Sequence, residues 1–187
     1  MDLVARAKAM VTAPKAEWPT IAGESTGTAE LYSGYIAPLA AITPVASVIG
    51  NLLFNGGLSF IASIVVAIVT FVIGLVGVYV LGLIASKIAP SFGGKDDSAQ
   101  GLKLVAYAYT AAWIAGIFNL IPTLALLSLI GGIYSLYLLY TGSSVMMGVP
   151  KERSAGYTAV VILVAIGVYI VIGIIVGSVI AAVSLAR

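Results

Sequence analysis

The sequence predicts an all-α integral membrane protein, a bundle of five transmembrane helices preceded by a short amphipathic helix at the membrane interface. Of the 187 residues, 61% are hydrophobic and only 9% are charged, whereas roughly a quarter of the residues in an average soluble domain are charged. With a mean hydropathy of +1.15, the chain has more apolar side chains than one water-facing core could hide. A lipid bilayer must therefore cover the remainder.

The sixteen charged residues fall in clusters that leave three charge-free segments. These segments are residues 31–86, 104–150 and 154–186, which number 56, 47 and 33. Because a helix needs about 20 residues to cross the hydrocarbon, the first two segments each fit two spans and the third fits one. The predicted spans are 32–52, 58–85, 104–120, 122–141 and 156–182, with residues 1–30 as a cytoplasmic or interfacial segment and residues 31–187 as the transmembrane domain.

Residues that break helices mark the two turns inside the longer segments. Asn55-Gly56-Gly57, shortly after Asn51, is the most polar and glycine-rich point of the first segment. Asn119 and Pro122 mark the second turn, since asparagine tolerates turn geometry and proline suits a first helical turn. A single kinked helix over 104–141 is the alternative, but it would measure about 57 Å against a hydrocarbon core of about 30 Å.

The distribution of Lys and Arg predicts a cytoplasmic N-terminus and an external C-terminus, because basic residues in short loops stay on the cytoplasmic side. With five spans, eight basic residues lie inside and only Arg187 lies outside. A four-span alternative that merges the middle hairpin places seven inside and two outside. No apolar run precedes position 31, so we expect the internal spans, not a secretory signal, to direct insertion.

The segment before the first span has the pattern of a short helix lying on the membrane surface. Apolar residues repeat there at roughly helical spacing opposite charged ones, at Leu3, Ala7, Met10 and Val11. Trp18 and Glu24 follow, and together with Lys151 and Arg153 of the second inner loop they are candidate interfacial or partner contacts. The alternatives are a solvated tail with one interfacial tryptophan and a dedicated partner-binding site.

Prolines and tyrosines are the most informative residues within the spans. Pro38 and Pro44 each remove a backbone donor and bend the first span, which either marks a substrate site or is a packing kink. Tyrosine hydroxyls deep in a bundle need hydrogen-bond partners, and this applies to Tyr107, Tyr109, Tyr134 and Tyr137. With Asn119, these tyrosines either line a polar internal cavity or serve as hydrogen-bonded packing residues.

Three small residues lie four apart on one face of the fifth span, at Gly173, Gly177 and Ala181. Small residues allow two helices to approach closely. They either pack the fifth helix inside its own bundle or form a dimer contact.

The residue inventory excludes several classes of function. The chain has no Cys and no His, which removes thiolate nucleophiles, imidazole bases and nearly every zinc, copper, haem or iron–sulfur site. No charged residue lies inside a predicted span, so ion coupling is not expected. A net charge of +2 is too small and too scattered for nucleic-acid binding. We therefore predict no catalytic, cofactor-binding or metal-binding residues and no nucleic-acid partner.

Four stretches follow one another along the chain: Pro14-Lys15-Ala16-Glu17-Trp18 with Ile21 and Glu24, then Phe92-Gly93-Gly94, then Val105-Ala106-Tyr107 through Ile121-Pro122, and finally Tyr134 to Thr158. Together they resemble the Yip (Ypt-interacting protein) family of five-span membrane proteins in its short prokaryotic form. One departure is the pair Ala111 and Ala112, where family members often have a proline. A kink produced by that proline would not transfer to this chain.

The resemblance implies a location in the prokaryotic cytoplasmic membrane, with the lipid bilayer, other membrane proteins or further copies of the chain as partners. Eukaryotic members of the family resemble adaptors that bind Rab-type small GTPases and assist vesicle budding, so a small GTPase is a partner by resemblance only. The expected function is that of a non-enzymatic membrane protein that organises membrane or binds other membrane-associated proteins. The alternative is a channel or carrier for a small neutral or lipid-like solute.

Overall fold

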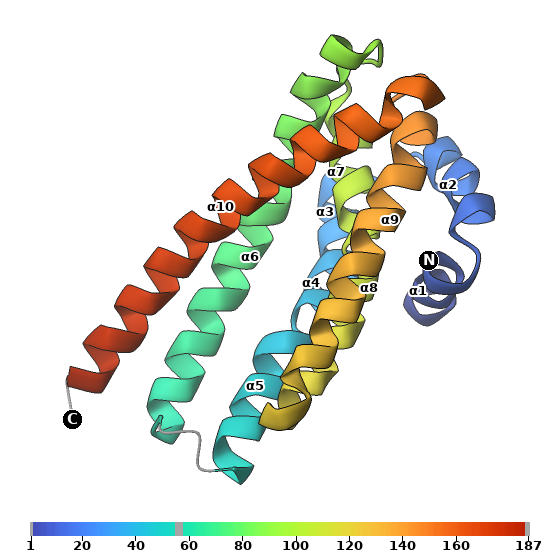
Figure 1. The fold of residues 1–187 in the computed structure, drawn as a ribbon. Coiled ribbons are helices and arrows are strands. Elements are labelled where there is room, and N and C mark those ends of the chain that lie inside the picture. The colour runs from blue at the N-terminus through green and yellow to red at the C-terminus, as the bar shows by residue number, and fades with distance from the viewer. Residues whose placement is uncertain (1, 55–57, 186–187) are drawn as a thin grey trace.

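The structure, a computed structural model, describes residues 2–54 and 58–185 and is a bundle of long helices (Figure 1). Five helical stretches of this part of the chain are long and apolar enough to cross a membrane: Thr28–Leu53, Phe60–Phe92, Ser98–Leu120, Pro122–Met146 and Lys151–Ala182. The described residues contain no β-strand. The predicted fold class, an all-α bundle of five spans, is confirmed.

The spans extend beyond the predicted bounds mainly at the end of the bundle that holds the charged loops. The third span begins at Ser98, not 104, and the fifth begins at Lys151, not 156, while the fourth continues to Met146 and the first begins at Thr28. Hydropathy locates only the part of a helix that crosses hydrocarbon, whereas the helix itself continues into the polar layer. The predicted turn at Asn55-Gly56-Gly57 and the external Arg187 lie outside the described residues.

Two short helices precede the first span, α1 (Leu3–Thr12) and α2 (Pro14–Gly23), and lie on the side of α9 (Ser128–Met146) away from α10 (Lys151–Leu185) (Figure 1). The Asp2 carboxylate caps α1 by accepting from the N–H groups of Val4 and Ala5. Ala7 and Met10 are buried against the bundle, while Val4 is exposed. Part of the apolar stripe expected to face lipid therefore packs on the protein itself.

The first span is broken into segments close to its two prolines. It consists of α3 (Thr28–Leu31), a π-helical turn (Tyr32–Ile36), α4 (Ala37–Ala40) and α5 (Ile42–Leu53). Pro38 has no N–H group and cannot form the usual hydrogen bond to the carbonyl four residues earlier. The turn before it is widened to a π-helix, in which the Ala37 N–H donates to the Tyr32 carbonyl five residues earlier. Pro44 lies in the first turn of α5, where a missing N–H costs little.

The third span also breaks, although it contains no proline. It consists of α7 (Ser98–Ala108), α8 (Thr110–Ala115) and a 3₁₀ turn (Gly116–Leu120), and a second 3₁₀ turn (Pro122–Leu127) leads into α9. At the break, the Thr110 hydroxyl donates to the Tyr107 carbonyl at 2.7 Å, and the Ala112 N–H donates to Ser135 Oγ at 3.0 Å. Side chains thus satisfy the backbone at the break, which forms without a proline.

Glycines make the closest helix crossings. Where α6 (Phe60–Ile88) meets α7, a Cβ added at Gly101 would lie 2.5 Å from the Gly82 carbonyl oxygen, and a Cβ at Gly131 of α9 would lie 2.5 Å from the Ala111 carbonyl oxygen. In contrast, nothing lies within 4 Å of a Cβ added at Gly173 or Gly177, and Ala181 is exposed. These three small residues therefore do not pack α10 inside its own bundle, and the dimer contact stays a prediction.

Candidate functional site

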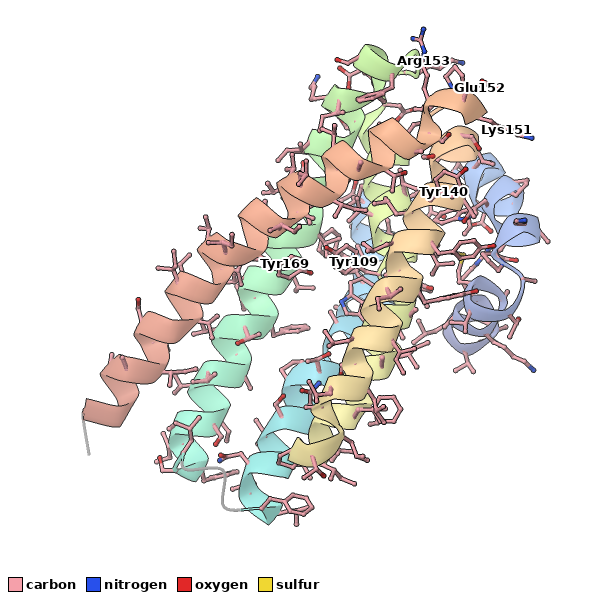
Figure 2. The ribbon with its side chains drawn as sticks, in the orientation of Figure 1. Tyr109, Tyr140, Lys151, Glu152, Arg153 and Tyr169 are labelled. Atoms are coloured by element: carbon pink, nitrogen blue, oxygen red, sulfur yellow. The ribbon has the colours of Figure 1, made fainter. Side chains whose placement is uncertain are left out.

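One end of the bundle, which we call the charged end, consists of the loop 89–97, the turn 147–150 and the start of α10 (Figure 2). The loop and the turn are joined by the Lys95 N–H, which donates to the Met147 carbonyl at 2.8 Å. Gly93, within the loop, has φ +83°, a conformation that favours glycine. The ring of Phe92 meets Tyr157 edge-on at 6.0 Å between centroids, and the Tyr157 hydroxyl donates to the Ala85 carbonyl at 3.0 Å.

A short ionic cluster holds the loop of the charged end to the second span. Asp96 accepts hydrogen bonds from the Lys87 ammonium at 2.6 Å and from the Ser86 hydroxyl at 2.7 Å. These two bonds, led by the one from Lys87, hold the pKa of the Asp96 carboxyl below its usual value. The next residue, Asp97, caps α7 by accepting from the N–H groups of Ala99 and Gln100, both at 3.0 Å.

The docking of α2 onto α9 depends on Trp18, whose side chain is fully buried. Its Nε1–H donates to the Thr141 hydroxyl at 3.1 Å. Gly142 leaves room for the indole, because a Cβ there would lie 2.6 Å from Trp18 Cε2. The residue expected at the membrane interface or at a partner is therefore an anchor inside the protein.

A second set of contacts joins α1, α2 and α7 through charged groups. The Arg6 guanidinium binds the carboxylates of both Glu17 and Glu24, and the Lys103 ammonium donates to the Glu24 carbonyl oxygen. Burial alone would lower the pKa of Arg6, but Glu24 and Glu17 outweigh it and the pKa is raised. Arg6 also lies 6.0 Å from the centre of the Tyr107 ring. Glu24 thus folds against Arg6, and Lys103, expected in a loop, is only 4% exposed.

A groove of about 540 Å³ lies between α9 and α10, with residues of α7 and α8 also in its wall. Its lining is almost wholly apolar and includes Leu136, Leu139, Val161, Ile162 and Ala165. The rings of Tyr109 and Tyr169 stack in it, with centroids 6.2 Å apart and planes at 28° (Figure 2). Such a groove can hold an apolar chain, whereas an ion would find few polar partners there.

A smaller pocket of about 400 Å³ lies between the start of α2, the last turns of α9 and the start of α10. In contrast to the groove, six of its seven lining residues carry an ammonium or a hydroxyl group: Lys15, Tyr140, Thr141, Ser144, Lys151 and Ser154. Val145 and the apolar parts of these side chains nevertheless supply most of the lining surface. Lys151, a predicted partner contact, therefore belongs to a pocket, whereas Arg153 lies against the loop of the charged end, with its Nη1 3.6 Å from a Cβ added at Gly93. We call this site the basic pocket.

Most of the residues proposed as a polar cavity do not come together, although the ring centroids of Tyr134 and Tyr137 lie 5.5 Å apart. Tyr107 is fully buried, with its ring 4.5 Å from that of Tyr35, whereas the Tyr134 hydroxyl donates to the Val11 carbonyl of α1 at 2.7 Å. Tyr137 is 40% exposed. Asn119 lies in the turn at the opposite end of the bundle, where its side chain donates to the Gly116 carbonyl at 3.0 Å. The alternative interpretation, hydrogen-bonded packing, describes Tyr134 and Asn119.

The turn between the third and fourth spans is held by short-range bonds and a close helix contact. Pro122 opens the second 3₁₀ turn after the extended residue Ile121. The Ser128 hydroxyl donates to the Ala115 carbonyl at 3.0 Å. Gly50 of α5 fits against this turn, since a Cβ there would lie 2.5 Å from the Asn119 carbonyl oxygen. The Asn119–Pro122 region is thus a packed turn.

Comparison with known proteins assigns the family. The sequence model of the Yip1 domain matches residues 8–184. The chain belongs to the Yip1 domain family. It is also similar to the inner membrane protein YohC of Escherichia coli K12 and of Escherichia coli O6:H1 strain CFT073, with 25% identity over 157 residues in each case. This match covers 78% of the chain and 80% of YohC. No solved structure matches the chain.

Three of the four stretches that resemble the Yip family in sequence meet at and beside the charged end, whereas the third stretch runs from Val105 to Pro122 at the opposite end. Trp18 of the first stretch packs on Gly142 of the last. Phe92 of the second stretch contacts Tyr157 of the last, and Gly94 lies so close to Val149 that an added Cβ would be 2.8 Å from its Cγ2. In this member of the Yip1 family, these three stretches therefore pack together around the ends of α2, α6, α9 and α10.

Several residues of this region escaped the sequence analysis. Tyr169 belongs to no pattern, and Lys15 belongs to the first stretch that resembles the family but is not selected there as a contact residue, because the roles of both depend on helices far away in the sequence. Tyr35 forms a buried 2.6 Å hydrogen bond with Thr110. The rule that a tyrosine hydroxyl within a span needs a partner applies to Tyr35 as well and could have selected it. Gly142 was another, since it lies directly after Thr141 in the stretch that resembles the family.

Proposed function

We propose that the protein is a non-enzymatic membrane protein that organises the inner membrane or binds other membrane-associated proteins through its charged end. The observation that carries the proposal is that the charged end and the helices α1 and α2 beside it form a preformed surface. Lys95 and Asp96 hold the loop of the charged end to the turn 147–150 and to α6. Trp18 fixes α2 to α9, and the Arg6 cluster fixes α1 and α2 to α7. A surface held in this way loses little conformational freedom when a partner binds, which favours association.

We further propose that the charged end faces the cytoplasm, with residues 1–30 at that face and the C-terminus outside. Eight of the nine basic residues on the inner side support this orientation, and the relative YohC is named an inner membrane protein. The chain lacks cysteine, so single cysteines can be labelled without background. A membrane-impermeant thiol reagent should label Phe54→Cys in intact cells but Ser98→Cys and Glu152→Cys only after the membrane is opened. Labelling of Glu152→Cys in intact cells would reverse the orientation.

The partners consistent with this proposal are other membrane proteins, a second copy of the chain or, by family resemblance, a small GTPase. A photo-crosslinking amino acid at the exposed Glu152 tests the charged end, and the same amino acid at the exposed Phe54 is the matched control at the opposite end. We expect reproducible protein adducts from position 152 and not from position 54. Adducts from neither position, or equally from both, would remove the support for a binding surface at the charged end.

A second candidate function is that of a carrier for a small neutral or lipid-like solute. The apolar groove between α9 and α10 favours it, because such a lining accepts a neutral chain and excludes ions. Flux assays in liposomes separate the two functions, since saturable uptake of a solute would support the carrier. Filling the groove by Ala165→Phe should then abolish the flux.

A further inference from the structure

We propose that the basic pocket and the groove together bind one anionic phospholipid from the leaflet at the charged end. The phosphate of the headgroup would lie in the basic pocket, and an acyl chain would lie in the groove between α9 and α10. This site goes beyond the proposed function, because it needs no protein partner.

The basic pocket has the chemistry of a phosphate site. Lys15 and Lys151 enter it from two different helices, and neither ammonium forms an ion pair with another residue in the described part of the chain. The hydroxyls of Tyr140 and Ser144 likewise have no hydrogen-bond partner among residues 2–54 and 58–185. Ammonium and hydroxyl donors without partners suit the oxygens of a phosphate. The N-terminus of α10 adds its partial positive charge.

The two lysines reach the pocket from two different helices, α2 and α10. Lys15 lies in the first turn of α2, which Trp18 fixes to α9, and Lys151 is the first residue of α10. Figure 2 shows Lys151 near the side of α9 on which α2 lies. The docking of α2 on α9 therefore places Lys15 in the same pocket as Lys151.

The pocket and the groove follow one another along both helices, although no residue lines both. On α9, Leu136 of the groove lies four residues before Tyr140 of the pocket, and residues four apart share a helix face. On α10, Ser154 of the pocket and Ile162 of the groove are eight residues apart on one face. Thr158 lies between them, and its buried hydroxyl, in a residue only 6% exposed, has no hydrogen-bond partner in the described chain.

The dimensions match one leaflet. From Ser144 in the pocket to Leu129 in the groove, α9 rises about 22 Å at 1.5 Å per residue. Half of a bilayer, from the outer headgroup region to the midplane, measures about 20–22 Å. The basic residues thus lie at headgroup depth when the groove lies among the acyl chains, which favours a membrane lipid over a free phosphate.

The test compares the binding of phosphatidylglycerol and phosphatidylcholine to the purified full chain by native mass spectrometry in mild detergent. We expect phosphatidylglycerol to bind more tightly. The double variant Lys15→Gln/Lys151→Gln should bind phosphatidylglycerol about 30-fold more weakly, since each lysine near an anionic headgroup contributes roughly fivefold. Its affinity for phosphatidylcholine should be unchanged. Ala165→Phe, which narrows the groove, should weaken the binding of both lipids.

The matched control is Lys8→Gln/Lys95→Gln, which removes the same charge from two exposed positions outside the pocket. Its affinity for phosphatidylglycerol should equal that of the unchanged protein. An equal loss in the control, or equal binding of the two lipids to the unchanged protein, would overturn the proposal. Displacement of the lipid by inorganic phosphate alone would also overturn it, because the acyl chain would then contribute nothing. Crosslinking from position 152 tests protein partners separately, so failure of either proposal can be told from failure of the other.

Discussion

The third and fifth spans differ in hydropathy and in burial, and the two quantities vary in opposite directions. The most apolar part of the third span has a mean hydropathy of only 1.3, yet 72% of it is buried inside the protein. The corresponding part of the fifth span has a mean hydropathy of 3.2, and only 6% of it is buried. The least apolar span is thus the centre of the bundle, and the most apolar one lies along its outside.

The opposite trends in hydropathy and burial follow from what surrounds each helix, which is lipid for the fifth span and protein for the third. A helix that faces lipid must be apolar, because acyl chains satisfy no hydrogen bond. A helix surrounded by protein can use small and polar residues, provided that each polar group has a partner. In the third span, Gly101 provides a close approach and Thr110 bonds to both Tyr35 and the Tyr107 carbonyl. Specific packing therefore concentrates in the third span, and lipid contact in the fifth.

The largest effect is expected from loosening the helices that cover the third span. Trp18→Ala removes a fully buried indole and its bond to Thr141, and loss of a buried tryptophan costs about 3–5 kcal/mol. Because Met10 of α1 is also fully buried, the cysteine of Met10→Cys should react slowly with a maleimide alone and rapidly when combined with Trp18→Ala. Trp18→Phe, which keeps most of the ring volume, is the control and should remain protected. Equal protection in all three proteins would show that Trp18 does not hold α1 and α2 in place.

A smaller effect compares glycines of the third and fifth spans directly. Gly101→Ala forces a Cβ to within 2.5 Å of the Gly82 carbonyl oxygen, a backbone atom that cannot rotate away. Overpacking of this kind costs about 1–3 kcal/mol. Gly173→Ala meets open space and should be neutral or stabilising by up to about 1 kcal/mol, the usual preference for alanine in a helix. Unfolding with increasing SDS in mild detergent measures both variants. A loss in Gly173→Ala equal to that in Gly101→Ala would indicate that a further copy of the chain covers α10.

The same comparison explains how far the sequence could predict the molecule. Five spans were predictable because the requirement for about 20 apolar residues is local and can be read along the chain. The helix contacts were not, because Gly101 and Gly173 look alike in sequence and differ only in what lies opposite. The ends of the spans were misplaced where charged residues, such as Lys103, continue a helix and find partners in another segment.

The candidate site was predictable only in fragments. Lys151 could be selected as a basic loop residue, and Tyr109 as a tyrosine inside a span. Their settings could not be predicted, because the basic pocket needs Lys15 of α2, and the stacked pair needs Tyr169 of α10. Trp18 and Glu24 are predicted as interfacial or partner contacts, but they contact the protein's own helices because α2 folds back onto α9. Pairing across distant segments is decided by tertiary packing, which no single-sequence pattern contains.

The smallest effect is expected at Asp96, in the loop that leads into the third span. Hydrogen bonds from Lys87 and Ser86 hold the pKa of Asp96 below its ordinary value of 3.8. Because the pKa is depressed in the folded protein, this contribution to stability is present above pH 3.8 and is lost as the pH falls through the lower folded value. The carboxylate is partly exposed, so solvent screening keeps the effect small.

Asp96→Asn isolates this contribution, since the amide keeps the shape of the side chain but not its charge. The variant should unfold slightly more easily than the unchanged protein near neutral pH, and the difference should shrink as the pH falls below 3.8 and through the lowered pKa of Asp96. Thermal unfolding in mild detergent across this pH range measures it. The substitution should not change the stability of the fifth span, because Asp96 anchors only the loop between α6 and α7. A difference that stays constant as the pH falls far below 3.8 would mean that the amide changes the loop by its hydrogen bonding, not by its charge.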